Sequence, residues 1–167
     1  MIALSTSGGT RGGTSLFYPH KAMKLTGPQG EFELNVIDYE YSDSAQFLTR
    51  NWLIVSMVTS KGDQRSTRTL TLLSTWELEM LRDWMQSVVD KAEAPPRLTF
   101  VEPTLSFSNF SDNKEHYLFR IGLTNEAKPN WHDDSKPYWL PVTPNRDELV
   151  LAIRDLAGQL AKFPVRA

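Results

Sequence analysis

The stretch Asn51-Trp-Leu-Ile-Val-Ser-Met-Val-Thr59 decides the fold of this chain. In an extended backbone successive side chains point to opposite faces. The apolar side chains then fall into two sets, Leu53, Val55 and Met57 on one face and Trp52, Ile54 and Val58 on the other. A strand that is apolar on both faces is typical of the middle of a sheet with other layers packed on it. The stretch therefore predicts a central strand.

The next residues predict a hairpin and a helix that packs on the sheet. A turn at residues 61–63 leads to a second strand at 66–73, and Ser74-Thr75-Trp76-Glu77 follows at once. This tetrad is a capping box, in which the serine hydroxyl accepts from a free helix N–H and the glutamate reaches back. Leu78, Leu81 and Met85 recur at helical spacing, so the helix has an apolar side to lay on the sheet.

The other elements complete an α+β fold. Alternating apolar residues predict further strands at 24–27, 31–41, 98–100, 105–107, 117–123 and 138–142. A closing helix is expected after Thr143 as N-cap and Pro144 as first helical residue. We predict a single, mainly antiparallel domain over residues 24–167, a curved sheet or sandwich-like, with two helices packed on it. Residues 1–23, rich in Ser, Thr and Gly, are expected to be a disordered tail, an over-extended start or a cloning remnant.

Composition limits the function classes. The chain has 167 residues, of which 40% are apolar, and a net charge of -2. Without a basic surplus we expect no direct nucleic-acid binding and no anionic membrane partner. The absence of cysteine excludes disulfides and thiolate chemistry and suits the cytoplasm. No apolar run approaches the roughly 20 residues that span a bilayer.

Two acidic segments are candidate partner-binding surfaces. In the strand from Glu31 the apolar alternation changes phase after Val36, so that Ile37 and Tyr39 continue the inner face, as one extra residue at a β-bulge would cause. The change keeps four carboxylates on one outward face, with a fifth just beyond: Glu31, Glu33, Asp38, Glu40 and Asp43. Most acidic runs are merely solvated faces, and a docking surface is the alternative. The second candidate is the loop at 125–136, where the aromatic Trp131 stands near Asp133 and Asp134.

A search for catalytic motifs gives little. His132, Asp133 and Asp134 adjoin in sequence and do not readily converge on one metal. We expect no cofactor, no metal and no catalytic residue. The alternative is an enzyme or small-ligand binder with a pocket formed by Glu102, Glu126 and His132. A structural subunit of a homo-oligomer is a third hypothesis, which a large self-complementary apolar patch would support.

Five blocks of the sequence together resemble the WapI-type immunity protein family. They are Asn51-Trp52-Leu53, Leu73 to Leu78 with Trp84, Phe100 to Phe107, Glu126 to Trp131, and the helix 156–160 with Phe163-Pro164-Val165-Arg166. The resemblance runs from about residue 24 to 166. It implies a small bacterial cytoplasmic antitoxin that binds and silences a cognate toxin domain, which in the family's namesake system is an RNA-cleaving nuclease. The expected function is thus non-catalytic immunity.

Overall fold

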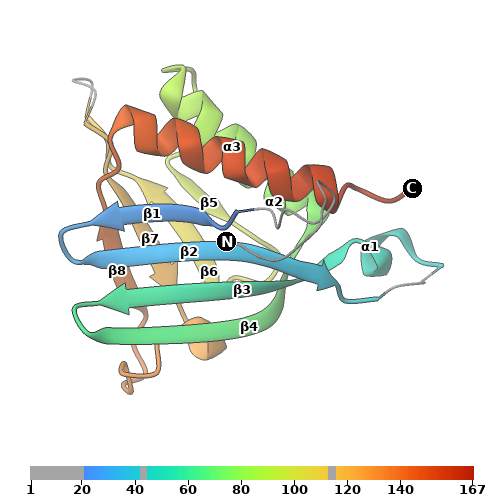
Figure 1. Cartoon of the computed structure of the whole chain (residues 1–167), viewed down its shortest axis with the longest axis horizontal. Coiled ribbons are helices and arrows are strands. Elements are labelled where there is room, and N and C mark those ends of the chain that lie inside the picture. The colour runs from blue at the N-terminus through green and yellow to red at the C-terminus, as the bar shows by residue number, and fades with distance from the viewer. Residues whose placement is uncertain (1–20, 42–44, 113–115) are drawn as a thin grey trace, which may run out of the picture.

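Two antiparallel sheets and two long helices make up the protein (Figure 1). The computed structural model describes residues 21–41, 45–112 and 116–167. Sheet A has the order β1 (Met23–Gly27), β2 (Gly30–Tyr39), β3 (Trp52–Lys61) and β4 (Gln64–Ser74). Sheet B has the order β5 (Arg97–Thr99), β6 (Leu105–Asn109), β7 (Phe119–Leu123) and β8 (Tyr138–Val142). The helical segments are α1 (Phe47–Arg50), α2 (Thr75–Val89), η3 (Asn125–Ala127) and α3 (Arg146–Lys162). The predicted α+β class is confirmed.

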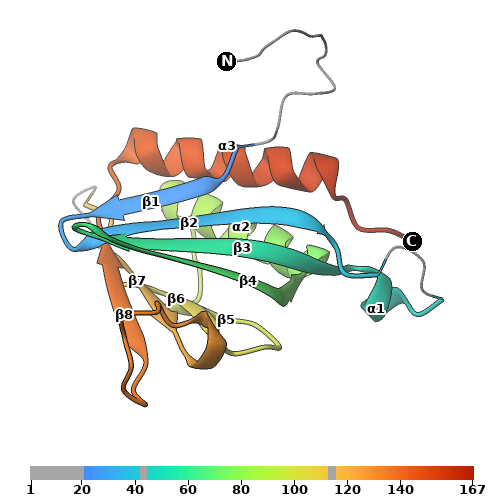
Figure 2. The ribbon, with the colours of Figure 1, turned by 60° about the horizontal axis from the view of Figure 1, so that its bottom comes forward.

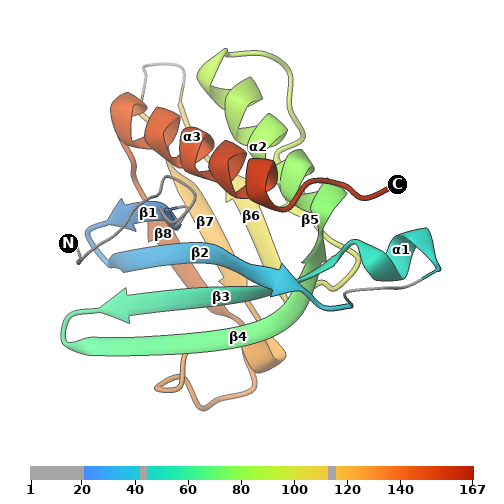
Figure 3. The same cartoon turned by 45° about the vertical axis from the view of Figure 1, so that its right-hand side comes forward.

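The two sheets face each other with their strands crossing at a steep angle (Figures 1 and 3). One hydrophobic core lies between them and includes side chains of both long helices. The rings of Phe32 in sheet A and Phe107 in sheet B meet edge to face at 6.2 Å. Helix α3 packs on α2 and beside β1 (Figure 2). Of the two predicted arrangements, the sandwich is the one that forms.

Strand β3 lies inside sheet A, between β2 and β4, as predicted. Its two faces differ, however. Leu53, Val55 and Met57 are at most 1% exposed, whereas Trp52, Ile54 and Val58 are only half-buried. The expectation that both faces are covered was wrong, because polar residues of the neighbouring strands, such as Glu33 and Thr67 on either side of Val58, flank the apolar side chains on the outer face. Sheet A therefore presents this face outward.

Both long helices begin with a capping box. In α2 the Ser74 hydroxyl accepts from the Glu77 N–H, and Glu77 accepts from the Ser74 N–H at 3.0 Å, as predicted. In α3 the N-cap is Asn145, with both reciprocal bonds to Glu148 at 2.8 Å. The predicted start at Thr143 and Pro144 was wrong by two residues, because the Asn-x-x-Glu pair satisfies two backbone N–H groups at once.

Strand β1 begins one residue earlier than the predicted strand at 24–27. Met23 is fully buried and opens β1, so it belongs to the sheet and not to a tail. Of the rest of the expected tail, residues 1–20 lie outside the described residues, as does Asp43. In the part of the chain that the structure describes, no helix is long and apolar enough to cross a membrane.

Candidate partner-binding surfaces

A β-bulge in β2 sets the acidic face. Val36 pairs with Val55 of β3, but the next pair along is Asp38 with Ile54, so Ile37 is the extra residue. The predicted bulge is thus confirmed in position. The prediction that Ile37 continues the inner face was wrong, since its side chain is 48% exposed. The inserted residue turns Asp38 outward, to the side on which Glu31 and Glu33 already lie.

The predicted carboxylates share the outer face of sheet A. Glu31, Glu33 and Asp38 stand opposite Ser60, Val58 and Ile54, all of which point away from the core. Glu40 follows the end of β2, where it accepts a hydrogen bond of 2.6 Å from the hydroxyl of Thr71. We call Glu31, Glu33, Asp38 and Glu40 the acidic face.

Charge is distributed unevenly along the acidic face. At one end the Lys24 ammonium lies 3.3 Å from the Glu31 carboxylate, and Lys24 is also the cross-strand partner of Glu33. At the other end Asp38 and Glu40 are exposed, and neither forms an ion pair with any residue that the structure places. The negative potential of the acidic face is therefore concentrated at its Asp38 and Glu40 end.

The C-terminal segment fixes that end of β2. The Arg166 guanidinium stacks 3.7 Å from the centre of the Tyr39 ring and donates to the carbonyls of Tyr41, at 2.6 Å, and Arg50. The Tyr39 hydroxyl donates to the Pro164 carbonyl at 2.5 Å. Burial raises the pKa of the Tyr39 hydroxyl, and the neighbouring Arg166 charge opposes this shift. This role of Arg166 has no signal in the sequence, because only the folded chain brings residue 166 to residue 39.

The second predicted surface, the loop at 125–136, is held along the edge of β4. Arg68 donates to the Lys128 carbonyl at 2.8 Å, and the Asn130 N–H donates to Ser66 at 2.9 Å. Trp131 is half-buried and packs edge to face on Tyr138, with ring centres 6.0 Å apart.

The carboxylates of this loop remain at its surface. Asp133 and Asp134 are exposed, and the Asp134 carboxylate lies 3.0 Å from the His132 ring nitrogen. The loop runs beyond β4, while the end of β2, where the strand carries Asp38, lies near α1 (Figure 1). The two acidic groups thus form two separate candidate surfaces.

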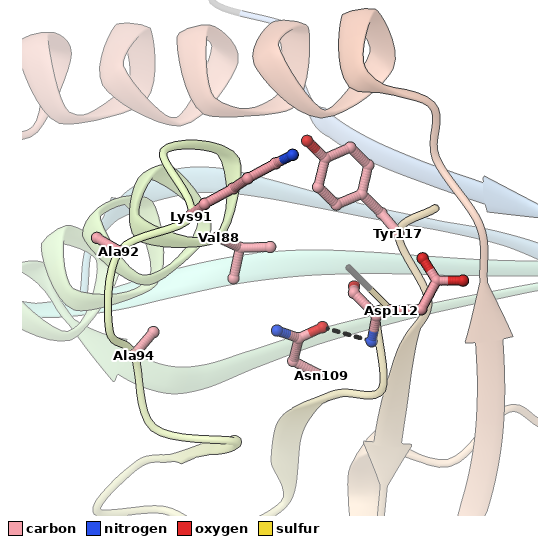
Figure 4. A pocket seen from close by; sticks show the side chains of 8 residues that line it. Val88, Lys91, Ala92, Ala94, Asn109, Asp112 and Tyr117 are labelled. Atoms are coloured by element: carbon pink, nitrogen blue, oxygen red, sulfur yellow. Dashed lines mark hydrogen bonds between the residues drawn. The ribbon is translucent and has the colours of Figure 1, made fainter. Parts of the chain in front are cut away.

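Two hollows lie in the described part of the chain, and neither contains the residues of the alternative pocket. A hollow of about 410 Å³ lies between the end of α2 and the start of the β6–β7 connection, where Val88, Asn109 and Tyr117 line it (Figure 4). A second hollow, of about 590 Å³, lies at the two hairpin turns of sheet A. Neither is lined by Glu102, Glu126 or His132. Among the described residues, no three Asp, Glu or His side chains are grouped so that they could hold a metal ion.

An exposed aromatic surface on sheet B was not predicted. Trp139 of β8 is 37% exposed on the outer face, and the Arg120 guanidinium lies 4.7 Å from its ring centre. Strand alternation gives a signal for it, since Trp139 lies between Tyr138 and Leu140, which face inward. Trp84, by contrast, lies in the core and is only 3% exposed.

Comparison with known proteins gives one family. The model of the family described as "Immunity protein WapI-like family" matches residues 24–164. No curated protein matches the chain. Two solved structures are similar in backbone. The structure of the plant transcriptional regulator PBF-2 has 8% sequence identity and a TM-score of 0.45, and the match covers 86% of this chain and 81% of that chain. The structure of WHY3 from Arabidopsis thaliana has 12% sequence identity and a TM-score of 0.44, and the match covers 88% of this chain and 89% of that chain.

Proposed function

Since this chain belongs to the WapI-like immunity protein family, which matches residues 24–164, we propose that it binds a cognate bacterial toxin domain and neutralises it without catalysis of its own. The family match is the observation that carries the proposal. Three buried polar side chains support it: Asn51, Glu77 and Gln159 all bond backbone groups and thus serve the scaffold. In this account the protein acts through its surface.

We place the toxin contact at the Asp38 and Glu40 end of the acidic face. A toxin that cleaves RNA needs a basic cleft for phosphates, and exposed carboxylates attract such a cleft and raise the rate of encounter. Asp38 and Glu40 meet this need because they are exposed and lack an ion pair among the described residues. The Arg166 stack on Tyr39 holds the strand beneath them in place before binding, which lowers the entropic cost of association.

Co-expression with the toxin domain encoded beside it tests the proposal. We expect cells that make both proteins to survive and the two chains to co-purify as a complex. A toxin domain with its active site inactivated should be captured equally well, because the contact does not require catalysis by either chain. Cell death and no complex, with both chains soluble, would reject the immunity function.

The loop with Trp131, Asp133 and Asp134 is the second proposed contact. An aromatic side chain beside two exposed carboxylates has the composition of an interface anchor. Trp131 already packs on Tyr138, so this surface is preformed. Either acidic surface can meet a basic toxin, and the variants described below distinguish them.

A further inference from the structure

The outer face of sheet B carries arginine and aromatic side chains that the acidic face does not use. The register aligns Arg97 of β5, Ser108 of β6, Arg120 of β7 and Pro141 of β8 in one row. The next row on the same face holds Thr99, Ser106, Gly122 and Trp139. Neither row contains a carboxylate. We call Arg97, Arg120, Trp139 and Phe110, which follows β6, the arginine–aromatic face.

Gly122 lets the Trp139 ring lie down on the sheet. A Cβ at residue 122 would come within 2.5 Å of the Trp139 ring and 2.6 Å of the Ser106 hydroxyl oxygen. The ring thus occupies the space that a side chain would take. Ser106 and Ser108 are only 4% and 8% exposed although they lie on the outer face. The ring therefore rests on Gly122, and Trp139 as a whole remains 37% exposed.

The two arginines are positioned by aromatic rings and leave their hydrogen-bond donors free. The Arg120 guanidinium lies 4.7 Å from the Trp139 ring centre and 5.1 Å from that of Phe110, and Arg97 lies 6.0 Å from Trp139. Within the described ranges neither arginine forms an ion pair or donates a hydrogen bond. A stacked guanidinium keeps its N–H groups available, and its planar fork matches a carboxylate.

We propose that the arginine–aromatic face is a docking surface for a protein segment that carries carboxylates beside an apolar side chain. The carboxylates bind Arg97 and Arg120, and the apolar side chain packs on Trp139 and Phe110, which are 37% and 54% exposed. Charge complementarity supports this occupant, since the two rows hold two unpaired cations and no anion. Buried contact with tryptophan and arginine is also what dominates the energy of protein interfaces.

A nucleic acid fits this face less well. Non-specific binding to a phosphate backbone depends on neutralising several phosphates, and this face offers only two arginines. The chain as a whole has a net charge of -2, which repels a long polyanion. A protein segment with one or two carboxylates matches the number of cations. The inference is independent of the toxin contact, which the acidic face makes in our proposal.

An NMR titration of the full chain tests this inference. The probe is a short capped peptide with a glutamate on each side of a leucine, and the comparison peptide has glutamines in place of the glutamates. We expect a saturable shift of the Trp139 indole N–H signal and of amides near Arg97 and Arg120. The glutamine peptide should bind about tenfold more weakly, because charged hydrogen bonds are lost.

Matched variants assign the effect to the arginines. Arg120→Gln and Arg97→Gln should each weaken peptide binding about tenfold, and Arg65→Gln, the same exposed change on sheet A, should leave it unchanged. The spectra of the free variants show whether each one is folded. Equal binding of the two peptides, no shift at Trp139, or shifts of the same signals by oligouridylate at lower concentration would overturn the proposal.

Discussion

Asn51 shows how much of this fold depends on one buried amide. The side chain is fully buried, and its oxygen accepts from the Arg166 N–H at 2.7 Å. Its nitrogen donates to the carbonyls of Phe47 and Arg166, both at 2.9 Å. The amide therefore binds the C-terminal segment as a neighbouring strand would. Two of the sequence blocks that resemble the family, at residues 51–53 and 163–166, meet at this contact.

Replacement of Asn51 by alanine should destabilise the protein. The change leaves the N–H and C=O of Arg166 without their partners beside the fully buried position 51. We expect the free energy of unfolding to fall by about 2–4 kcal/mol, since more than one hydrogen bond is lost and a buried polar group costs about 1–3 kcal/mol when unpaired. Urea denaturation followed by circular dichroism measures it.

Asn130 provides the matched control for this variant. Its side chain is exposed, and its contact to Ser66 runs through the backbone N–H, which alanine keeps. Asn130→Ala should change the free energy of unfolding by less than about 0.5 kcal/mol. If Asn51→Ala changes the free energy of unfolding as little as Asn130→Ala does, the C-terminal segment does not depend on the Asn51 amide.

At the scale of the elements, the cap of α2 also joins the helix to sheet B. One carboxylate oxygen of Glu77 accepts from Ser74 and caps the helix. The other accepts from the Val101 N–H at 2.8 Å, in the segment that follows β5. Glu77 is only 3% exposed, so water does not replace either partner. A capping motif that is local in sequence thus connects two layers of the fold.

Glu77→Gln should therefore lower the free energy of unfolding by more than a weaker helix cap alone would. The glutamine amide has one acceptor oxygen, so either Ser74 or Val101 loses its acceptor. We expect a loss of about 1–3 kcal/mol in the free energy of unfolding. Glu79→Gln, two residues along the same helix and less buried, is the control and should change it by less than about 0.5 kcal/mol. Equal effects of the two changes would show that the Val101 bond contributes nothing.

The elements were largely predictable from the sequence, but their partners were not. The apolar alternation of 51–59, the capping box at Ser74 and the phase change after Val36 are local patterns, and each gave the right element. The register is not local: only the fold places Lys24 beside Glu31 and so neutralises one end of the acidic face.

Gln159 is a second case in which the sequence carried no signal. Its position on α3 gives no sign that its buried amide accepts from Val36 and donates to Leu34, continuing the ladder of β2 where β1 has ended. The acidic residues were predicted to share one face, and the register places Glu31, Glu33 and Asp38 there. Their role in toxin binding remains a prediction.

At the scale of the whole molecule, the acidic face and the arginine–aromatic face carry opposite charge on the outer faces of the two sheets. The acidic face lies on the outside of sheet A and the arginine–aromatic face on the outside of sheet B, with the core between them. A net charge of -2 conceals this separation. Long-range steering of a basic toxin should then depend on the exposed carboxylates and not on the arginine–aromatic face.

Neutralising Asp38 and Glu40 together should slow toxin association. For the variant with Asp38→Asn and Glu40→Gln we expect the association rate constant at low salt to fall about threefold to tenfold, with the difference shrinking as salt screens the charges. Stopped-flow fluorescence over a range of salt concentrations measures both effects.

The loop supplies the competing variant for the same experiment. Asp133→Asn with Asp134→Asn removes the same charge from the other candidate surface. If this pair slows association and the change at Asp38 and Glu40 does not, the loop is the contact and our placement on sheet A is wrong.

The central claim, that this chain neutralises its toxin by contact and not by chemistry, is tested most directly by stoichiometry. The purified chain is titrated into a fixed amount of active toxin, and the remaining toxin activity is measured at each ratio after equilibration. The account predicts that activity falls linearly and vanishes at one chain per toxin, independent of incubation time. Progressive loss of all activity at a small fraction of one equivalent would contradict it.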